Sequence, residues 1–152
     1  MLDTSGEDAL RYPLKLEDAL VVPLDTLKAP GRIVWGKSHK DETLSAVGLT
    51  GDYFYKPFEV SEDYFEYTGA AMHIDPSGRG MDETGYCITK FLNGMIFVLK
   101  VGGLKGGYDR ATLAQLARIA AEYKPNIIEI EDNFGDGMYT QLFKPVLHEF
   151  YS

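Results

Sequence analysis

The dipeptide Asn93-Gly94 joins two apolar, strand-like runs at residues 85–92 and 95–101 and leaves this part of the chain few ways to fold. Asn-Gly adopts the positive φ angles of a two-residue turn and is the strongest short-range signal for a β-hairpin. A third run, Ala70–Ile74, precedes the hairpin and stops at Asp75-Pro76, because proline cannot donate to a sheet ladder. The sequence therefore predicts an antiparallel meander of three strands.

Beyond the hairpin, helical and strand patterns alternate. Apolar residues recur at helical spacing over residues 113–123, between the N-cap candidate Asp109 and the helix-stopping Pro125. The β-branched run 127–131 predicts a fourth strand, and a second helix follows it. We expect Pro145 to kink that helix. Its predicted buried face comprises Met138, Leu142, Val146 and Phe150.

This order of elements returns the fourth strand parallel to the first, through a right-handed crossover. The predicted fold class is α/β: a ribonuclease-H-like mixed sheet, made of a three-stranded antiparallel meander and a parallel fourth strand, with flanking helices. We assign residues 68–152 to this core. Residues 1–67 contain four prolines and are predicted to form an irregular arm or interdomain linker that packs on the core.

The net charge of −8 argues against a nucleic-acid partner until its distribution is considered. Residues 68–152 carry 10 acidic and 8 basic side chains, and seven of these acids fall in the stretches 75–83 and 129–136. The remaining surface of this region is therefore mainly basic. Arg79 and Lys105 are our candidates for contacts to substrate phosphates. A cluster of acidic side chains on an otherwise basic domain suits metal-assisted phosphate chemistry.

Two carboxylates mark the C-terminal ends of the strands that are predicted to be parallel neighbours. Asp75 ends the first strand and Glu131 the fourth, so their side chains should lie side by side. Carboxylates about 4–5 Å apart repel by roughly 3–4 kcal/mol, which favours either protonation of one, as in a glycosidase, or a bridging cation. Glu129 points to the same face but lies further from the strand end, so we rank it below Glu131.

A hard cation with oxygen ligands fits this pair better than zinc does. The chain has one cysteine, Cys87, and its three histidines lack zinc-ligand spacing. Mg²⁺ binds one or two carboxylates together with waters and phosphate oxygens, and two such ions can serve phosphodiester cleavage. A purely structural role also remains open, because Asp-Pro is a common strand exit and glutamates often line the solvent face of an edge strand.

Other functional classes find less support in the sequence. Residues 77–80 form a glycine-containing loop without the Lys-Ser/Thr ending of a P-loop, so no ATPase module is recognised. The N-terminus lacks the basic start and apolar stretch of a signal peptide, and no apolar run approaches the roughly 20 residues needed to cross a bilayer. We therefore expect an intracellular protein with no membrane partner.

Three motifs resemble the large terminase subunit of short-tailed bacteriophages. They are Ile74-Asp75-Pro76-Ser77-Gly78-Arg79-Gly80, Asp82-Glu83-Thr84 and Glu131-Asp132-Asn133-Phe134-Gly135-Asp136-Gly137. The likeness extends upstream through residues 11–16 and 47–52 and so covers most of the chain. It implies a C-terminal nuclease domain of ribonuclease-H-like fold, in which Asp75 and Glu131 match metal-binding catalytic carboxylates and Asp82 matches an acidic position beside them.

The resemblance also implies a reaction and partners. Such a domain is an endonuclease that uses two Mg²⁺ or Mn²⁺ ions to cut concatemeric double-stranded DNA in the cytoplasm of the bacterial host. It works with an ATPase domain, a small terminase subunit and the capsid portal. The family pattern continues past residue 152 with a third catalytic aspartate, so we expect a truncated, C-terminally incomplete domain and weak or no cleavage by the isolated chain.

Two further classes are weighed against the nuclease. A catalytically inactive DNA-binding or portal-docking fragment would keep the fold without the chemistry. A nucleotide-binding domain of the actin-like type shares the core strands but requires a second phosphate loop, and none is visible in the sequence. The dependence of metal binding on Asp75 and Glu131 separates the nuclease from the inactive fragment.

Overall fold

The chain divides into two compact units in the computed structural model, residues 1–25 with 30–64 and residues 26–29 with 65–152. The structure describes residues 20–22, 24–34, 40–41, 53–76, 83–131 and 137–151. The sequence placed the boundary after residue 67, and packing of the N-terminal part on the core stays a prediction. Among the described residues, no helix is long and apolar enough to span a membrane.

Upstream of the main sheet, the described residues form short strands. β2 (Ile33–Val34) pairs antiparallel with β3 (Glu59–Val60). β1 (Lys28–Pro30) pairs with β4 (Tyr64–Glu66). Each of these strands has only two or three residues, so the described part of this region has little regular structure.

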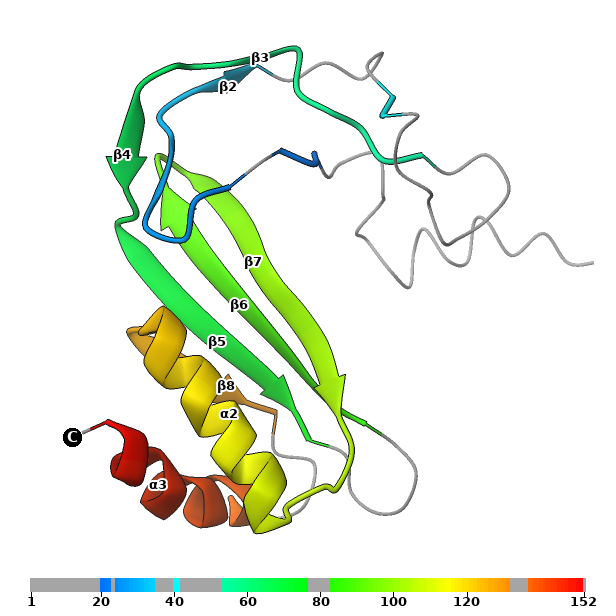
Figure 1. Ribbon diagram of the computed structural model, residues 1–152, viewed down its shortest axis with the longest axis vertical. Coiled ribbons are helices and arrows are strands. Elements are labelled where there is room, and N and C mark those ends of the chain that lie inside the picture. The colour runs from blue at the N-terminus through cyan, green and yellow to red at the C-terminus, as the bar shows by residue number, and fades with distance from the viewer. Residues whose placement is uncertain are drawn as a thin grey trace, which may run out of the picture. The chain divides into compact units, whose positions relative to one another are not determined.

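The second unit is built on a mixed sheet with the strand order β7-β6-β5-β8 (Figure 1). β6 is antiparallel to both β7 and β5, whereas β8 runs parallel to β5. The strands are β5 (Gly69–Asp75), β6 (Thr84–Leu92), β7 (Met95–Leu104) and β8 (Ile127–Ile130). The predicted meander with a parallel fourth strand is therefore confirmed.

The β6–β7 hairpin turns at the predicted dipeptide. Asn93 and Gly94 have φ angles of 51° and 77°. Positive φ at both central positions is the turn geometry whose twist matches that of the flanking strands. The pairing shifts register between Ile88 and Thr89, an irregularity that the sequence pattern did not predict.

β7 extends three residues beyond its predicted end, through Gly102 and Gly103 to Leu104. The two glycines look like a loop in the sequence, yet both are paired strand residues. A Cβ on Gly102 would lie 2.5 Å from the Tyr86 hydroxyl oxygen and 2.7 Å from its ring. A Cβ on Gly103 would collide with the carboxylate of Glu83. A side chain at Gly102 would therefore have to displace the ring of Tyr86, and one at Gly103 the exposed side chain of Glu83.

Asn126 aligns the parallel pair at its start. Its backbone amide donates to the carbonyl oxygen of Ala70 at 2.9 Å, and its side-chain Oδ1 accepts from the amide of Ala70 at 3.0 Å. The pairing then runs in register from Ala71 with Ile127 to Ile74 with Ile130. Asn126 thus fixes which residues of β5 and β8 face each other.

Helices α2 (Arg110–Tyr123) and α3 (Met138–Phe150) pack on the same face of the sheet (Figure 1). α2 follows Asp109 and ends before Pro125, as predicted, with Lys124 in the left-handed region at φ 51°. The buried core of this unit combines residues of both helices with those of β5 and β6. It comprises Met72, Ile74, Ile88, Leu113, Leu116, Ala117, Ala120, Tyr139, Phe143 and Val146.

Of the predicted buried face of α3, Val146 is buried and Phe150 packs against the core, whereas Met138 and Leu142 lie outside it. Tyr139 and Phe143 are 0% and 2% exposed, whereas Met138 and Leu142 are 38% and 41% exposed. The helix carries apolar residues on both candidate faces, and the buried one includes Tyr139, whose hydroxyl has a hydrogen bond with the side chain of Thr84 in the sheet. The helix runs unbroken through Pro145.

Lys90 is buried at the end of the sheet where β5 begins. Its Nζ donates to the carbonyl oxygen of Thr26 at 2.7 Å and lies 5.4 Å and 5.9 Å from the ring centroids of Tyr67 and Tyr123. Burial lowers the pKa of this lysine. These contacts hold the segment Thr26–Ala29 on the second unit.

Candidate metal and nucleic-acid site

Asp75 and Glu131 stand at adjacent strand ends. Asp75 is the last residue of β5, and Glu131 follows β8 directly. The amide nitrogen of Glu131 donates to the carbonyl oxygen of Ile74 at 2.9 Å, which continues the ladder up to this point. Because paired strands lie about 4.8 Å apart, the two carboxylates leave the sheet from neighbouring positions. Both residues are exposed.

The two carboxylates lie on the face of the sheet opposite the helices. Residues directly opposite each other in paired strands share a face, so Asp75 groups with Gly85, and His73 with Cys87. A groove of about 740 Å³ crosses this face. Its lining residues come from all four strands and are His73, Ile74, Asp75, Gly85, Tyr86, Cys87, Val101, Gly102, Glu129, Ile130 and Glu131.

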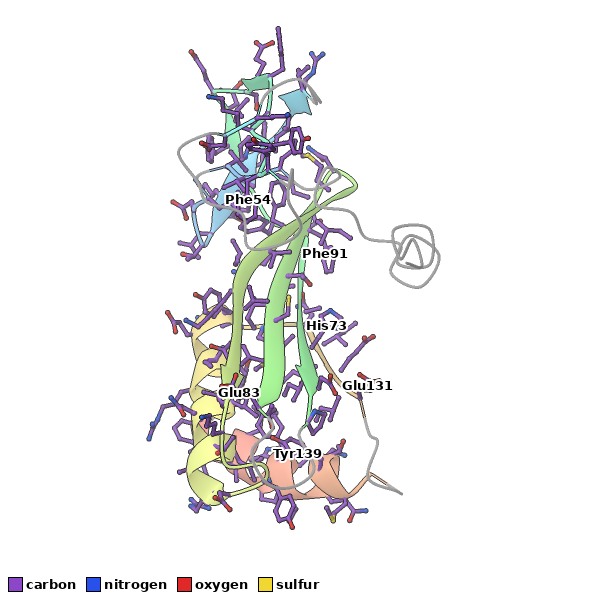
Figure 2. The ribbon with its side chains drawn as sticks, turned by 90° about the vertical axis from the view of Figure 1, so that its right-hand side faces the viewer. Phe54, His73, Glu83, Phe91, Glu131 and Tyr139 are labelled. Carbon is purple, nitrogen blue, oxygen red and sulfur yellow. The ribbon has the colours of Figure 1, made fainter. Side chains whose placement is uncertain are left out.

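The side chains of His73 and Glu129 are in contact within this groove. Nδ1 of His73 lies 3.2 Å from Oε2 of Glu129, and the side chains are 46% and 68% exposed. Figure 2 shows His73 on the strand that leads to the carboxylate end, where Glu131 lies. The sequence did not single out His73, although its position two residues before Asp75 on one strand puts both on the same face.

The other predicted site residues are distributed around this end of the sheet. Lys105 is exposed and directly follows β7. Asp82 and Arg79 lie outside the described residues. Glu83, next to Asp82, is exposed and reaches over Gly103 of the edge strand β7. Glu131 follows β8, which is the opposite edge strand of the sheet (Figure 2).

Asp75 and Glu131 suit a hard cation by the chemistry of their donors. No basic side chain in the described part of the chain forms an ion pair with either carboxylate. Mg²⁺ and Mn²⁺ prefer such oxygen donors, and Mg²⁺ needs only one or two protein carboxylates. Among the residues that the structure describes, no group of three or more His, Cys, Asp or Glu is placed to hold a metal ion.

Cys87, in the floor of the groove, is not a candidate nucleophile. Burial raises the pKa of its thiol. A thiol attacks as the thiolate, so a raised pKa reduces the reactive fraction at neutral pH.

Comparisons with known proteins point to one family. The family model for the ribonuclease H-like domain of the bacteriophage T7 terminase matches residues 74–152. The terminase large subunit of Enterobacteria phage T3 is 43% identical over 149 residues, which make up 97% of this chain and 25% of that protein. The chain thus spans about a quarter of the length of this curated relative.

Proposed function

Because this chain belongs to the ribonuclease H-like domain family of the bacteriophage T7 terminase, we propose that it is the metal-dependent endonuclease portion of a DNA-packaging terminase. Its substrate would be concatemeric double-stranded DNA, cut at phosphodiester bonds by a two-metal mechanism in the cytoplasm of the bacterial host. The observation that carries this proposal is the position of Asp75 and Glu131 at adjacent ends of parallel strands.

The backbone around the two carboxylates supports this role. Asp75 and Glu131 are attached to paired strands, so their spacing is set by the sheet and does not depend on a flexible loop. Neither is neutralised by a basic side chain of the described residues, so the pair is available to a cation. Two adjacent carboxylates without such a partner repel each other, and a bound cation removes that repulsion.

Asp75 and Glu131 would hold the metal ions, and Asp82 would assist from the segment outside the described residues. Ions bound there supply activation of the attacking water and stabilisation of the leaving oxygen. The exposed Lys105 would orient the DNA by contacting a phosphate, and Arg79 is proposed to do the same. From the resemblance to the terminase family, we propose that the working assembly also includes an ATPase domain, a small terminase subunit and the portal.

Calorimetric titration of the chain with Mn²⁺ tests the proposal. Asp75→Asn and Glu131→Gln should each weaken Mn²⁺ binding more than ten-fold, because each removes a charged oxygen ligand. Glu122→Gln, on the exposed side of α2, is the matched control and should bind as the wild type does. Unchanged Mn²⁺ binding by Asp75→Asn would refute the assignment.

Plasmid nicking in Mn²⁺ provides the activity test. The isolated chain should nick supercoiled plasmid weakly or not at all, and any nicking should disappear in Asp75→Asn. Nicking that survives this substitution would contradict the proposed role of Asp75. Robust nicking by the wild-type chain would show that the carboxylates within these residues suffice for catalysis.

A catalytically inactive DNA-binding or portal-docking fragment is the second candidate. The observation that favours it is the absence of a group of three metal-binding side chains among the described residues. In that case the chain would bind DNA equally well with EDTA and with Mn²⁺, and calorimetry would detect no Mn²⁺ binding that depends on Asp75. The same titration therefore separates the two candidates.

A further inference from the structure

Four polar residues stand in two successive rungs, or pairs of facing residues, of the parallel ladder between β5 and β8. His73 pairs with Glu129 in the first rung. In the next rung, Asp75 ends β5 and Glu131 follows β8. Residues two apart along a strand point to the same face, and all four line the same groove. Glu129 therefore has the imidazole beside it and two carboxylates in the rung ahead of it.

The position of Glu129 makes it a third carboxylate within reach of the Asp75 and Glu131 rung. With strands about 4.8 Å apart and a rise of about 3.3 Å per residue, the Cα atoms of Glu129 and Asp75 are roughly 8 Å apart. The Glu129 side chain is 68% exposed, so it has room to turn along the groove. By strand position alone, Glu129 could therefore join a cation held by the next rung.

The contact with His73 directs Glu129 elsewhere. Nδ1 of His73 lies 3.2 Å from Oε2 of Glu129, across their own rung. A carboxylate oxygen only accepts, so this contact is favourable when Nδ1 carries a hydrogen. In this arrangement, no group of three His, Cys, Asp or Glu side chains among the described residues is placed to hold a metal ion. Glu129 is thus not grouped with Asp75 and Glu131 while it contacts His73.

The number of carboxylates decides what else a cation can bind. Mg²⁺ and Mn²⁺ favour octahedral coordination by oxygen, and phosphodiester chemistry needs some of those positions for water and phosphate oxygens. A third carboxylate would occupy a further position. It would also strengthen cation binding, because affinity rises with the number of charged ligands. Keeping Glu129 away leaves that position to water or substrate.

We propose that His73 is a positioning residue, which holds Glu129 away from the cation so that β8 contributes one carboxylate, Glu131, to the site. This inference rests on the proposed nuclease function, because it assumes that Asp75 and Glu131 bind a metal ion. In this role His73 acts only through Glu129. Loss of the imidazole should therefore add a ligand to the site, and cation binding should become tighter.

Calorimetric titration with Mn²⁺ of four variants tests this role. His73→Ala should bind Mn²⁺ about three-fold more tightly than the wild type, a modest gain because an exposed contact of this kind is weak. The double variant His73→Ala with Glu129→Gln should lose the gain and bind as Glu129→Gln does. His73→Asn should stay near the wild type, because its amide Nδ2 takes the place of Nδ1 and can donate to Glu129.

His148→Ala is the matched control, since His148 is an exposed histidine on α3. It should bind Mn²⁺ as the wild type does, which shows that losing an imidazole elsewhere has no effect. A three-fold gain that persists in the double variant would overturn the proposal, because the imidazole would then act on the cation without Glu129. A gain in His73→Asn equal to that in His73→Ala would do so too.

The wild-type titration separates this inference from the proposed function. If the wild type binds Mn²⁺ in a manner that depends on Asp75, and His73→Ala binds with unchanged affinity, only the role of His73 is refuted. If the wild type binds no Mn²⁺, the metal site itself is refuted, and the role of His73 with it.

Discussion

Nδ1 of His73 lies 3.2 Å from Oε2 of Glu129, across the parallel pair of β5 and β8. Two residues further along the same strands stand Asp75 and Glu131, for which no basic partner is found in the described part of the chain. The two glutamates that follow each other on this face of β8 therefore have different surroundings. Glu129 contacts an imidazole, whereas Glu131 has no such contact among the described residues.

Glu129→Gln should leave Mn²⁺ affinity within about two-fold of the wild-type value, since Glu129 is engaged by His73. Titration calorimetry of this variant beside Glu131→Gln measures the difference. Equal losses in the two variants would mean that both glutamates bind the metal. The two substitutions are isosteric, so circular dichroism spectra should be unchanged and any difference in affinity is local.

Gly102→Ala should destabilise the second unit by about 1–3 kcal/mol, because the new methyl group meets the ring of Tyr86. Urea unfolding measures the change. Gly85→Ala is the control, since its Cβ would have only the Cβ of Asp75 as a neighbour, at an ordinary distance of 4.0 Å. Similar costs for both glycines would show that strand propensity, and not the Tyr86 contact, decides the effect.

Phe143→Ala should cost about 3–5 kcal/mol of stability, because it empties a core position that is 2% exposed. Leu142→Ala, one residue earlier on the same helix, should cost well under half of that, since Leu142 is 41% exposed. Thermal or urea unfolding of the two variants checks the orientation of α3. The reverse order would restore the helix face that the sequence suggested.

Sequence patterns predicted the elements that local chemistry decides. Asn93-Gly94 specifies its own turn, and Pro125 ends α2 whatever lies around it. The predicted buried face of α3 was right for Val146 and Phe150 and wrong for Met138 and Leu142, because two faces of this helix are apolar and only tertiary packing distinguishes them. Gly102 and Gly103 were taken for a loop because their neighbours Tyr86 and Glu83 are distant in sequence.

In the candidate site, too, some features follow from the local sequence and others only from tertiary contacts. The predicted strand ends placed Asp75 and Glu131 side by side, and the structure has both at adjacent strand ends. Their role as metal ligands stays a prediction. The contact between His73 and Glu129 depends on the exact register of two strands that are more than fifty residues apart, which periodicity alone does not define. Asp82 and Arg79 lie outside the described residues, and their roles stay predictions.

Tyr139→Phe should alter the pH dependence of stability in alkali. Burial raises the pKa of Tyr139 above its ordinary value of 10.0. The stability that the un-ionised Tyr139 contributes is therefore fully present below about pH 10. It is lost as the pH rises, because Tyr139 ionises in the unfolded chain before it ionises in the folded protein. Above that pH, urea unfolding should show the wild type losing stability faster than the variant, by at most about 1.4 kcal/mol per pH unit, until Tyr139 ionises in the folded protein as well.

The comparison between the two proteins isolates Tyr139. Tyr151 has a raised pKa and Lys90 a lowered one, and both are present in wild type and variant alike, so their effects cancel in the difference. Parallel pH profiles would mean that Tyr139 ionises equally in the folded and unfolded states, contrary to its burial.

The alignment set by Asn126 makes the carboxylate pair sensitive to chain length. From Ala70 to Asp75 and from Asn126 to Glu131 the two strands each advance five residues, so both carboxylates arrive at the sheet edge together. Inserting one residue in either strand would turn one carboxylate to the helix side, and inserting two would leave it a full repeat, about 6.6 Å, out of step. Substitutions on the exposed positions of β5 and β8 would leave this alignment in place, whereas changes of length would not.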